Sequence, residues 1–176
     1  GDICCISLDG IKNITSGEGG IIITNDKVVT QKISDARLLG VEKDTENRFK
    51  GKRSWDFDVT QQGWRYHMSD VMAAIGKEQL KNFDFHKIRR QELAKCYVVH
   101  LMEIPEISIF SHDYDSVVPH IFVILLSEAT DREWVIKFLG ENDIPTGIHY
   151  KPNHWLSYFS STPRETLPVT EKLFPK

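Results

Sequence analysis

The chain has 176 residues and a net charge of −3, from 22 Lys and Arg residues against 25 Asp and Glu residues. A balance this close to neutral gives no electrostatic footprint for nucleic acid or an anionic membrane. No apolar run approaches the roughly 18 residues needed to span a bilayer, no signal peptide is visible, and the three cysteines do not suggest a disulfide framework. We therefore expect a reduced, cytoplasmic protein that has neither nucleic acid nor a membrane as a partner.

The first predicted element is a strand formed by the apolar run Ile3–Ile6. Unbroken apolar runs are typical of strands that are covered on both faces in a parallel sheet. Functional groups in such sheets cluster just past the carboxyl ends of the strands, which is where Ser7 and Lys12 stand. A glycine-rich turn at residues 17–20 then leads into a second apolar strand, Ile21–Ile23. We therefore expect Lys12 to be held between two buried strands.

Lys12 is the residue of this region with the most distinctive chemistry. An amine held partly out of water is a better nucleophile near neutral pH, because burial disfavours its charged form. The residue pattern alone also leaves open an ordinary surface lysine in a loop. A phosphate-binding nucleotide loop is excluded by the order of residues, since its lysine follows the glycines whereas Lys12 precedes them.

A helix is expected after the second strand. Asn25 or Asp26 can cap its start, and Gly40 is expected to end it. Residues 41–62 then form a polar stretch, dotted with aromatic residues, that has no clear periodicity. Loops of this length in a compact domain are usually functional or mobile, so we expect this one near the mouth of a substrate site.

Beyond residue 62 the pattern alternates between helices and short strands. Ser69 can cap a helix that is apolar nearly all round, so we expect that helix to be buried in the core or at a subunit interface. Thr130 and Glu133 form a capping box for a later helix. The other expected elements are a helix from about His86 to Met102 and strands at Ile107–Phe110, at His120–Leu126 and from Pro145 and Gly147 through Tyr150.

Four blocks of the sequence carry motifs in a fixed order. They are Ser7, Lys12, Ile14, Thr15 and Gly17–Gly20; Gly63–Asp70, continuing to Leu80; Pro119–Val123; and Thr146–Pro152 with His154. Together the blocks cover nearly the whole chain and resemble the pyridoxal-phosphate (PLP)-dependent sugar aminotransferases of the DegT/DnrJ/EryC1/StrS family. The lysine motif of that family reads approximately Ser-Phe-His-x-x-Lys-x-Ile-Thr-x-Gly-Glu-Gly-Gly.

The resemblance implies an α/β fold, the carboxyl-terminal portion of a fold-type-I PLP-dependent aminotransferase. Residues 1–88 are expected to be the carboxyl-terminal part of the large, mixed-sheet domain that binds PLP. Residues 89–176 are expected to be the small α/β domain, incomplete at its end. Family members are much longer than this chain, so we expect a fragment. Their first half supplies an aromatic ring that stacks on the cofactor, a carboxylate that faces the pyridine nitrogen and several phosphate ligands.

The function implied by the resemblance is transfer of an amino group from glutamate to a keto group of a nucleotide-linked sugar, in lipopolysaccharide, O-antigen or related amino-sugar biosynthesis. Lys12 would hold the cofactor aldehyde and shuttle a proton. Ser7 corresponds to a serine that binds the cofactor phosphate, and Arg65 to a residue that reaches the cofactor phosphate of the neighbouring subunit in a homodimer with shared active sites. His149 lies on a strand at the active-site entrance and is expected to contact substrate.

The sequence departs from the family pattern near the expected cofactor. Arg65 stands where most relatives have Asn, and His67 replaces the usual arginine of that block, so either residue could lie nearer the phosphate. Asp9 replaces the usual histidine before the lysine. The spacing of His149 and His154, with no nearby carboxylate, does not indicate a metal site.

One alternative function stays open at this stage. The chain could be a noncatalytic piece that needs a separate, complementary N-terminal half before it binds PLP. Relatives that use the same fold for sugar dehydration replace the lysine, so Lys12 argues against that activity.

Overall fold

A computed structural model of the chain describes residues 1–176 except 44–46, 48–49, 53–54 and 163–164. It divides into two units, Gly1–Lys87 and Ile88–Lys176, which are taken in turn. Part of the stretch 41–62, expected near a substrate mouth, therefore lies outside the described residues. Within the rest of that stretch, Val41 and Val59 form an isolated antiparallel bridge.

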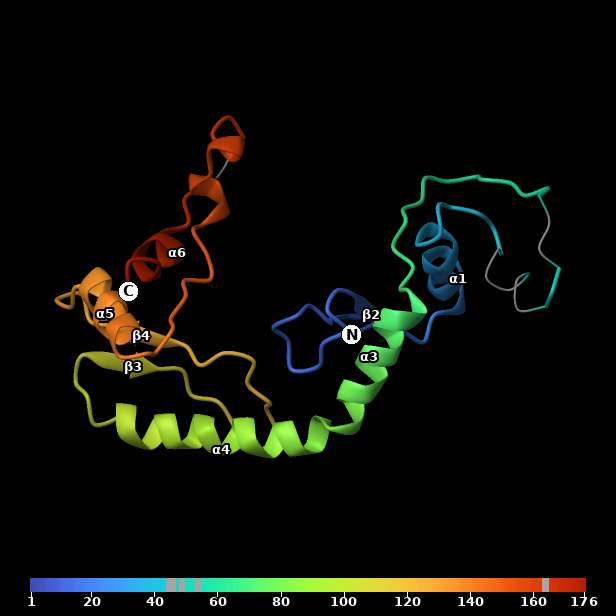
Figure 1. The fold of residues 1–176 in the computed structure, drawn as a ribbon. Helices are drawn as coiled ribbons and strands as arrows, with labels where there is room; N and C mark the ends of the chain where they lie inside the picture. The colour runs from blue at the N-terminus through green and yellow to red at the C-terminus, as the bar shows by residue number, and fades with distance from the viewer. Residues whose placement is uncertain (44–46, 48–49, 53–54, 163–164) are drawn as a thin grey trace. The chain divides into compact units, whose positions relative to one another are not determined.

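The first unit begins with an antiparallel hairpin of β1 (Ile3–Ser7) and β2 (Gly20–Thr24), drawn in blue in Figure 1. The pairing runs from Ile3 opposite Thr24 to Ser7 opposite Gly20. The expectation of parallel strands covered on both faces is therefore wrong for this chain. Antiparallel neighbours need only a returning loop, whereas parallel neighbours need a longer crossover. Every residue of β1 and all three isoleucines of β2 are exposed.

Helix α1 (Lys27–Ala36) follows the hairpin. The carboxylate of Asp26 accepts hydrogen bonds from the backbone N–H groups of Val28 at 2.7 Å and Val29 at 3.1 Å, which confirms the expected cap. The helix ends before Gly40, the expected stop. Gly40 has a φ of 76°, and an ideal Cβ there would lie 2.3 Å from the carbonyl oxygen of Gln61, so this glycine permits close approach of a second backbone segment.

Helix α3 (Asp70–Lys81) begins at the predicted cap, because Ser69 Oγ accepts from the backbone N–H of Met72 at 3.3 Å. The expectation that the core of this chain buries the helix is wrong. None of its residues is buried, and Val71 is 70% exposed. The alternative location, a subunit interface, stays a prediction.

The second unit is built on α4 (Phe83–Leu101), whose Ala94 is 2% exposed. The helix starts slightly before the expected His86. Strands β3 (Ile107–Ile109) and β4 (Ile124–Leu126) pair antiparallel. The strand expected at His120–Leu126 is thus confined to its last three residues. Arg90 of α4 donates to the carbonyl oxygens of Pro119 at 3.4 Å and His120 at 3.3 Å. At the start of the expected strand, these carbonyl groups thus bond to a side chain and not to a neighbouring strand.

Helix α5 (Arg132–Glu141) is capped by Asp131, not by Thr130 as expected from the capping box. Asp131 Oδ1 accepts from the backbone N–H of Trp134 at 3.1 Å, while the hydroxyl of Thr130 pairs with that of Ser127 at 2.7 Å. The prediction of a last strand, from Pro145 and Gly147 through Tyr150, is also wrong, because residues 144–152 have no regular structure. The remaining elements are two 3-10 turns, η1 (Asn153–Trp155) and η2 (Ser157–Phe159), and α6 (Pro168–Leu173).

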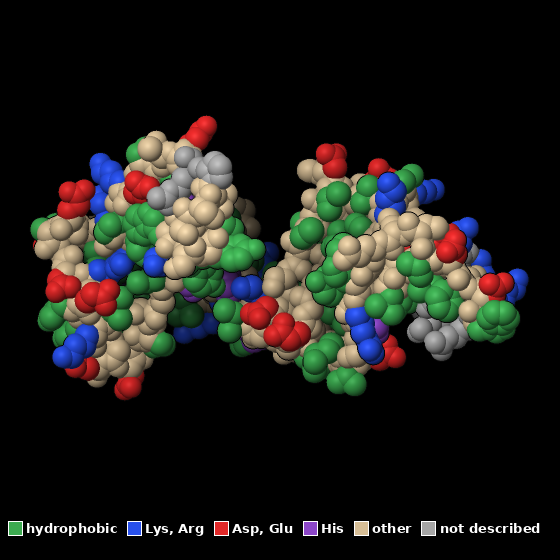
Figure 2. All heavy atoms as spheres, turned by 90° about the horizontal axis from the view of Figure 1, so that it is seen from above, with side chains coloured by type: hydrophobic (Ala, Val, Ile, Leu, Met, Phe, Trp, Pro, Cys, Tyr) green, Lys and Arg blue, Asp and Glu red, His purple; other side chains and the backbone are tan. Residues whose placement is uncertain are grey.

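Apolar side chains reach the surface in both units, as Figure 2 shows. The buried apolar residues described are few: Leu8, Ala94, Tyr114 and Leu126. In the described part of the chain, no helix is both long and apolar enough to cross a bilayer.

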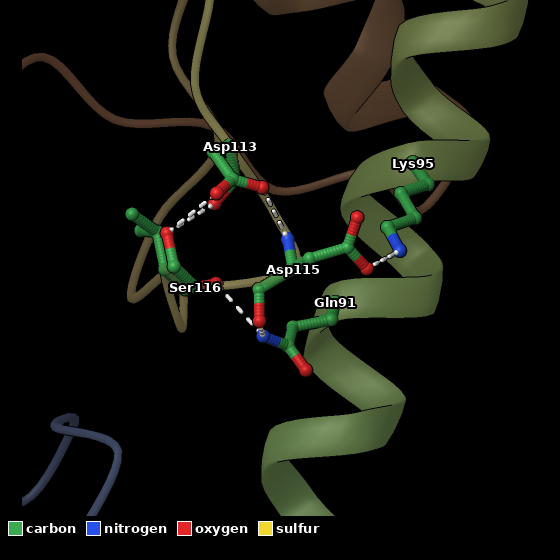
Figure 3. Close-up of polar contacts among 6 residues, drawn as sticks. Gln91, Lys95, Asp113, Asp115 and Ser116 are labelled. Atoms are coloured by element: carbon green, nitrogen blue, oxygen red, sulfur yellow. Dashed lines mark hydrogen bonds and ion pairs between the residues drawn. The ribbon is translucent and has the colours of Figure 1, made fainter.

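An ion pair and a hydrogen bond join Asp115, in the loop after β3, to α4 (Figure 3). Asp113 accepts from the backbone N–H of Asp115 at 3.0 Å and from the hydroxyl of Ser116 at 2.9 Å. Asp115 in turn pairs with Lys95 at 2.5 Å, and Gln91 donates to the carbonyl oxygen of Asp115 at 3.1 Å. The backbone N–H of Asp115, followed by the Ser116 hydroxyl, lowers the pKa of Asp113 below its ordinary value of 3.8.

We predict that Ser116→Ala raises the pKa of Asp113 towards 3.8, because one donor to the ionised carboxylate is lost. A group with a lowered folded pKa stabilises the fold above its unfolded pKa, and this contribution disappears as pH falls through the folded pKa. Carboxyl-carbon NMR titration measures the change. Ser108→Ala, at an exposed position of β3, is the control. An Asp113 titration that is identical in Ser116→Ala and wild type would contradict the assignment.

Candidate functional site

Lys12 lies in a closed loop, residues 8–19, that joins β1 to β2. Leu8 closes the loop with both of its backbone groups: its N–H donates to Gly19 at 2.9 Å, and its carbonyl oxygen accepts from the N–H of Ser16 at 2.9 Å. The backbone N–H of Lys12 donates to the carbonyl oxygen of Asp9 at 3.0 Å, which makes a tight turn at the lysine. Lys12 is half-buried in this loop although both strands beside it are exposed.

Gly17 and Gly19 stand in the loop at positions where a side chain would be strained or would clash. Gly17 has a φ of 84°, in the left-handed region that favours glycine. Gly19 has a φ of 146°, and an ideal Cβ there would lie 2.4 Å from Met68 Cε and 2.8 Å from Ser16 Oγ. The glycine-rich turn therefore lets the chain return to β2 against close neighbours.

Ser7 and Lys12 belong to one turn, and Asp9 links them. The Ser7 hydroxyl oxygen accepts from the backbone N–H of Asp9 at 3.3 Å, and Asp9 Oδ1 accepts from the N–H of Ile11 at 3.2 Å. Asp9 thus stabilises the turn that leads to Lys12. The sequence signal for this role was the dipeptide Asp9-Gly10, a common turn former.

Arg65 lies in the same unit on a different segment. Its neighbours bind the end of α1: the N–H of Trp64 donates to Ala36 at 2.7 Å, and the N–H of Tyr66 donates to Arg37 at 2.9 Å. Arg65 and the nearby His67 are exposed. The described contacts thus assign Arg65 to the α1 end of the unit and Ser7 and Lys12 to the hairpin loop.

A groove of about 1470 Å³ lies within the first unit. Residues of both strands, the end of the lysine loop (Glu18 and Gly19), α1, the segment 64–69 and α3 line it. Most of its wall is apolar, including Ile6, Ile21, Ile22, Ile23, Ile33 and Met72. Ser7, Lys12 and Arg65 are not among its lining residues. The groove is therefore an apolar surface along the hairpin that reaches the end of the lysine loop but not Lys12 itself.

His149 belongs to the second unit, in the irregular segment 144–152. It is exposed, and its ring stacks on Tyr150 with centroids 4.7 Å apart. His154, the other histidine of that block, pairs instead with Glu171 at 3.1 Å. Within the described ranges, no three His, Cys, Asp or Glu side chains are grouped as a metal ion would require.

The donor set of the first unit suits a cofactor with an aldehyde and a phosphate. Lys12 offers an amine to the aldehyde, held in a loop whose geometry is fixed. Ser7 offers a hydroxyl, and Arg65 a guanidinium, both groups that bind phosphate well. The sequence pattern predicted these three residues and marked Asp9 as a departure from the family motif, but it predicted neither the turn-forming role of Asp9 nor the burial of Ser16.

Comparison with known proteins supplies relatives for the whole chain. The model of the DegT/DnrJ/EryC1/StrS aminotransferase family matches residues 1–176. The chain is 33% identical over 164 residues to the spore coat polysaccharide biosynthesis protein SpsC of Bacillus subtilis, a match that covers 90% of this chain and 42% of that protein. It is 30% identical over 161 residues to the UDP-4-amino-4,6-dideoxy-N-acetyl-beta-L-altrosamine transaminase of Campylobacter jejuni, covering 90% of this chain and 41% of that protein.

Solved structures show the same partial coverage. The sugar aminotransferase CalS13 from Micromonospora echinospora superposes with a TM-score of 0.83 at 25% identity, over 98% of this chain and 44% of its own. PseC from Helicobacter pylori, an aminotransferase of pseudoaminic acid biosynthesis, gives a TM-score of 0.84 at 23% identity, over 98% of this chain and 46% of PseC. These likenesses confirm the predicted fold class, a mixed α/β portion of the fold-type-I aminotransferases. The chain spans less than half the length of these relatives.

We predict that Gly19→Ala lowers the free energy of unfolding by about 1–3 kcal/mol, because the added Cβ meets Met68 and Ser16 at an unfavourable φ. Denaturant unfolding measures the change. Gly140→Ala in α5 is the matched control, since no atom lies within 4 Å of its ideal Cβ and alanine favours a helix. Equal stability of Gly19→Ala and wild type would contradict the steric account of the loop.

Proposed function

Because the chain belongs to the DegT/DnrJ/EryC1/StrS aminotransferase family, we propose that it carries the lysine of a PLP-dependent amino transfer from glutamate to a keto group of a nucleotide-linked sugar. The observation that supports this most is the half-buried Lys12 in a loop closed by the backbone of Leu8. A lysine in a fixed, partly dry position is suited to capture an aldehyde.

We assign the two units to the two domains of the family fold. Residues 1–88 form the carboxyl-terminal part of the PLP-binding large domain, and residues 89–176 form the small domain. The division of the chain near Lys87 supports this assignment. On this proposal the first unit holds the cofactor.

PLP, when bound, supplies an electron sink for the carbon that loses and gains a proton. The Lys12 amine would hold the cofactor aldehyde and, when free, would carry that proton. The Ser7 hydroxyl and the Arg65 guanidinium would bind the phosphate, with Arg65 reaching the site of a neighbouring subunit in a homodimer. His149 contacts the substrate.

The names of two relatives support a class of substrate for the proposed reaction. The Campylobacter jejuni protein is a transaminase of a UDP-linked amino sugar, and the Bacillus subtilis protein is named for polysaccharide biosynthesis. A nucleotide-linked sugar destined for surface polysaccharide, such as lipopolysaccharide or O-antigen, agrees with both names. The proposed location is the cytoplasm, where such activated sugars are made.

The exposed hairpin supports a second candidate, a half-protein that needs a complementary, separate N-terminal half to bind PLP. The isoleucines of β2 are exposed, the neighbouring groove is largely apolar, and the chain spans 42% of the spore coat protein. Apolar surface of this extent usually marks an interaction site. On this candidate the chain alone is noncatalytic.

We predict that Lys12→Ala in the complete enzyme lowers the rate of amino transfer by roughly 10³-fold or more, because the only amine assigned to hold the cofactor and carry the proton is removed. The measurement follows glutamate-dependent amination of a UDP-linked 4-ketosugar. Lys27→Ala, in exposed α1, is the matched control and should retain the wild-type rate. An unchanged rate in Lys12→Ala would exclude the proposed role.

The second candidate makes a separate prediction. If the chain needs a complementary half, the purified 176-residue chain should neither bind PLP nor aminate the ketosugar, and both activities should appear when the remaining part of the family fold is supplied. Cys5 lines the apolar groove, so its thiol should lose reactivity in that complex while Cys96 keeps its own. Turnover by the chain alone would eliminate this candidate.

A further inference from the structure

Ser16 lies inside the Lys12 loop, and neither the lysine motif nor the chemistry above gives it a role. Its side chain is fully buried, at 0% exposure. Burying a hydroxyl costs free energy unless the hydroxyl is hydrogen-bonded. Ser16 Oγ donates to the carbonyl oxygen of Glu18 at 2.8 Å and lies 3.5 Å from that of Leu8. The hydroxyl therefore holds Glu18, while the backbone N–H of the same residue, which donates to Leu8 at 2.9 Å, links it to the other side of the loop.

The same residue contacts α3. An ideal Cβ on Gly76 would lie 3.4 Å from Ser16 Cβ and 4.0 Å from Leu8 Cδ1, so the helix presents a residue without a side chain at this point. An ideal Cβ on Gly19 would lie 2.8 Å from Ser16 Oγ, so Gly19 also leaves room for this side chain. Ser16 thus packs against two glycines, one in α3 and one in the glycine-rich turn.

We propose that Ser16 is the positioning residue of the loop, and that by tying residues 8–19 to α3 it fixes where the Lys12 amine stands. The proposal rests on the proposed function of Lys12. Ser16 acts through Leu8 and Glu18, whose backbone groups it holds, and not by touching cofactor or substrate. Its removal leaves the Glu18 carbonyl without the donor at 2.8 Å and favours local opening of the loop.

The test measures how accessible the Lys12 amine is to a small reagent, and it needs no cofactor. Acetic anhydride acetylates lysine amines according to their accessibility, and peptide mass spectrometry gives the rate at Lys12 relative to exposed Lys27 in the same sample. Ser16→Ala should raise this ratio by roughly 5-fold or more, because the loop opens more often. Ser16→Cys, which keeps a weak donor on the same carbon, should lie closer to wild type.

A second variant approaches the contact from the helix. Gly76→Val places a branched side chain against Ser16 and should also raise the ratio of Lys12 to Lys27, whereas Ser108→Ala, at the exposed position of β3, should not. An unchanged ratio in both Ser16→Ala and Gly76→Val would overturn the proposal. Equal acceleration at Lys12 and at the half-buried Lys87 of α4 would overturn it too, because that result means general destabilisation. Failure of the proposed function would appear elsewhere, as undiminished amino transfer in Lys12→Ala.

Discussion

The backbone of Leu8 is the point on which the candidate site depends. Its N–H and carbonyl groups pair with Gly19 and Ser16 across the base of the loop, directly beyond the last rung of the hairpin. This pairing turns a flexible connection between two strands into a closed loop with few conformations. Fixing a reactive group before reaction lowers the entropic cost of catalysis, so the closure would favour the role that we propose for Lys12.

The extent to which sequence predicted the structure differs between local and long-range features. The cap at Ser69 was predicted correctly, and that of α1 was narrowed to Asn25 or Asp26, because a cap is decided by a few neighbouring residues. The prediction that Thr130 caps α5 was wrong, because Asp131 beside it is an equally good cap and only the backbone geometry distinguishes the two. The candidate site divides in the same way: Ser7 and Lys12 share one local turn, whereas the buried packing of Ser16 against Gly76 joins segments far apart in sequence.

The wrong prediction for β1 has a physical lesson of its own. An apolar run reports that a strand is suited to burial on both faces, but it does not report which partner or which direction of pairing provides the cover. In this chain the strand pairs antiparallel and stays exposed. Since related proteins are more than twice as long as the matched region, the apolar hairpin and groove agree with a surface that the rest of the family fold covers.

The central claim is that Lys12 captures the aldehyde of PLP, and reductive trapping tests it most directly. The complete enzyme is incubated with PLP, reduced with borohydride, digested and read by peptide mass spectrometry. The account predicts a phosphopyridoxyl group on the peptide that contains Lys12 and none on the peptide that contains Lys27. A label spread over exposed lysines, with Lys12 unmodified, would contradict it.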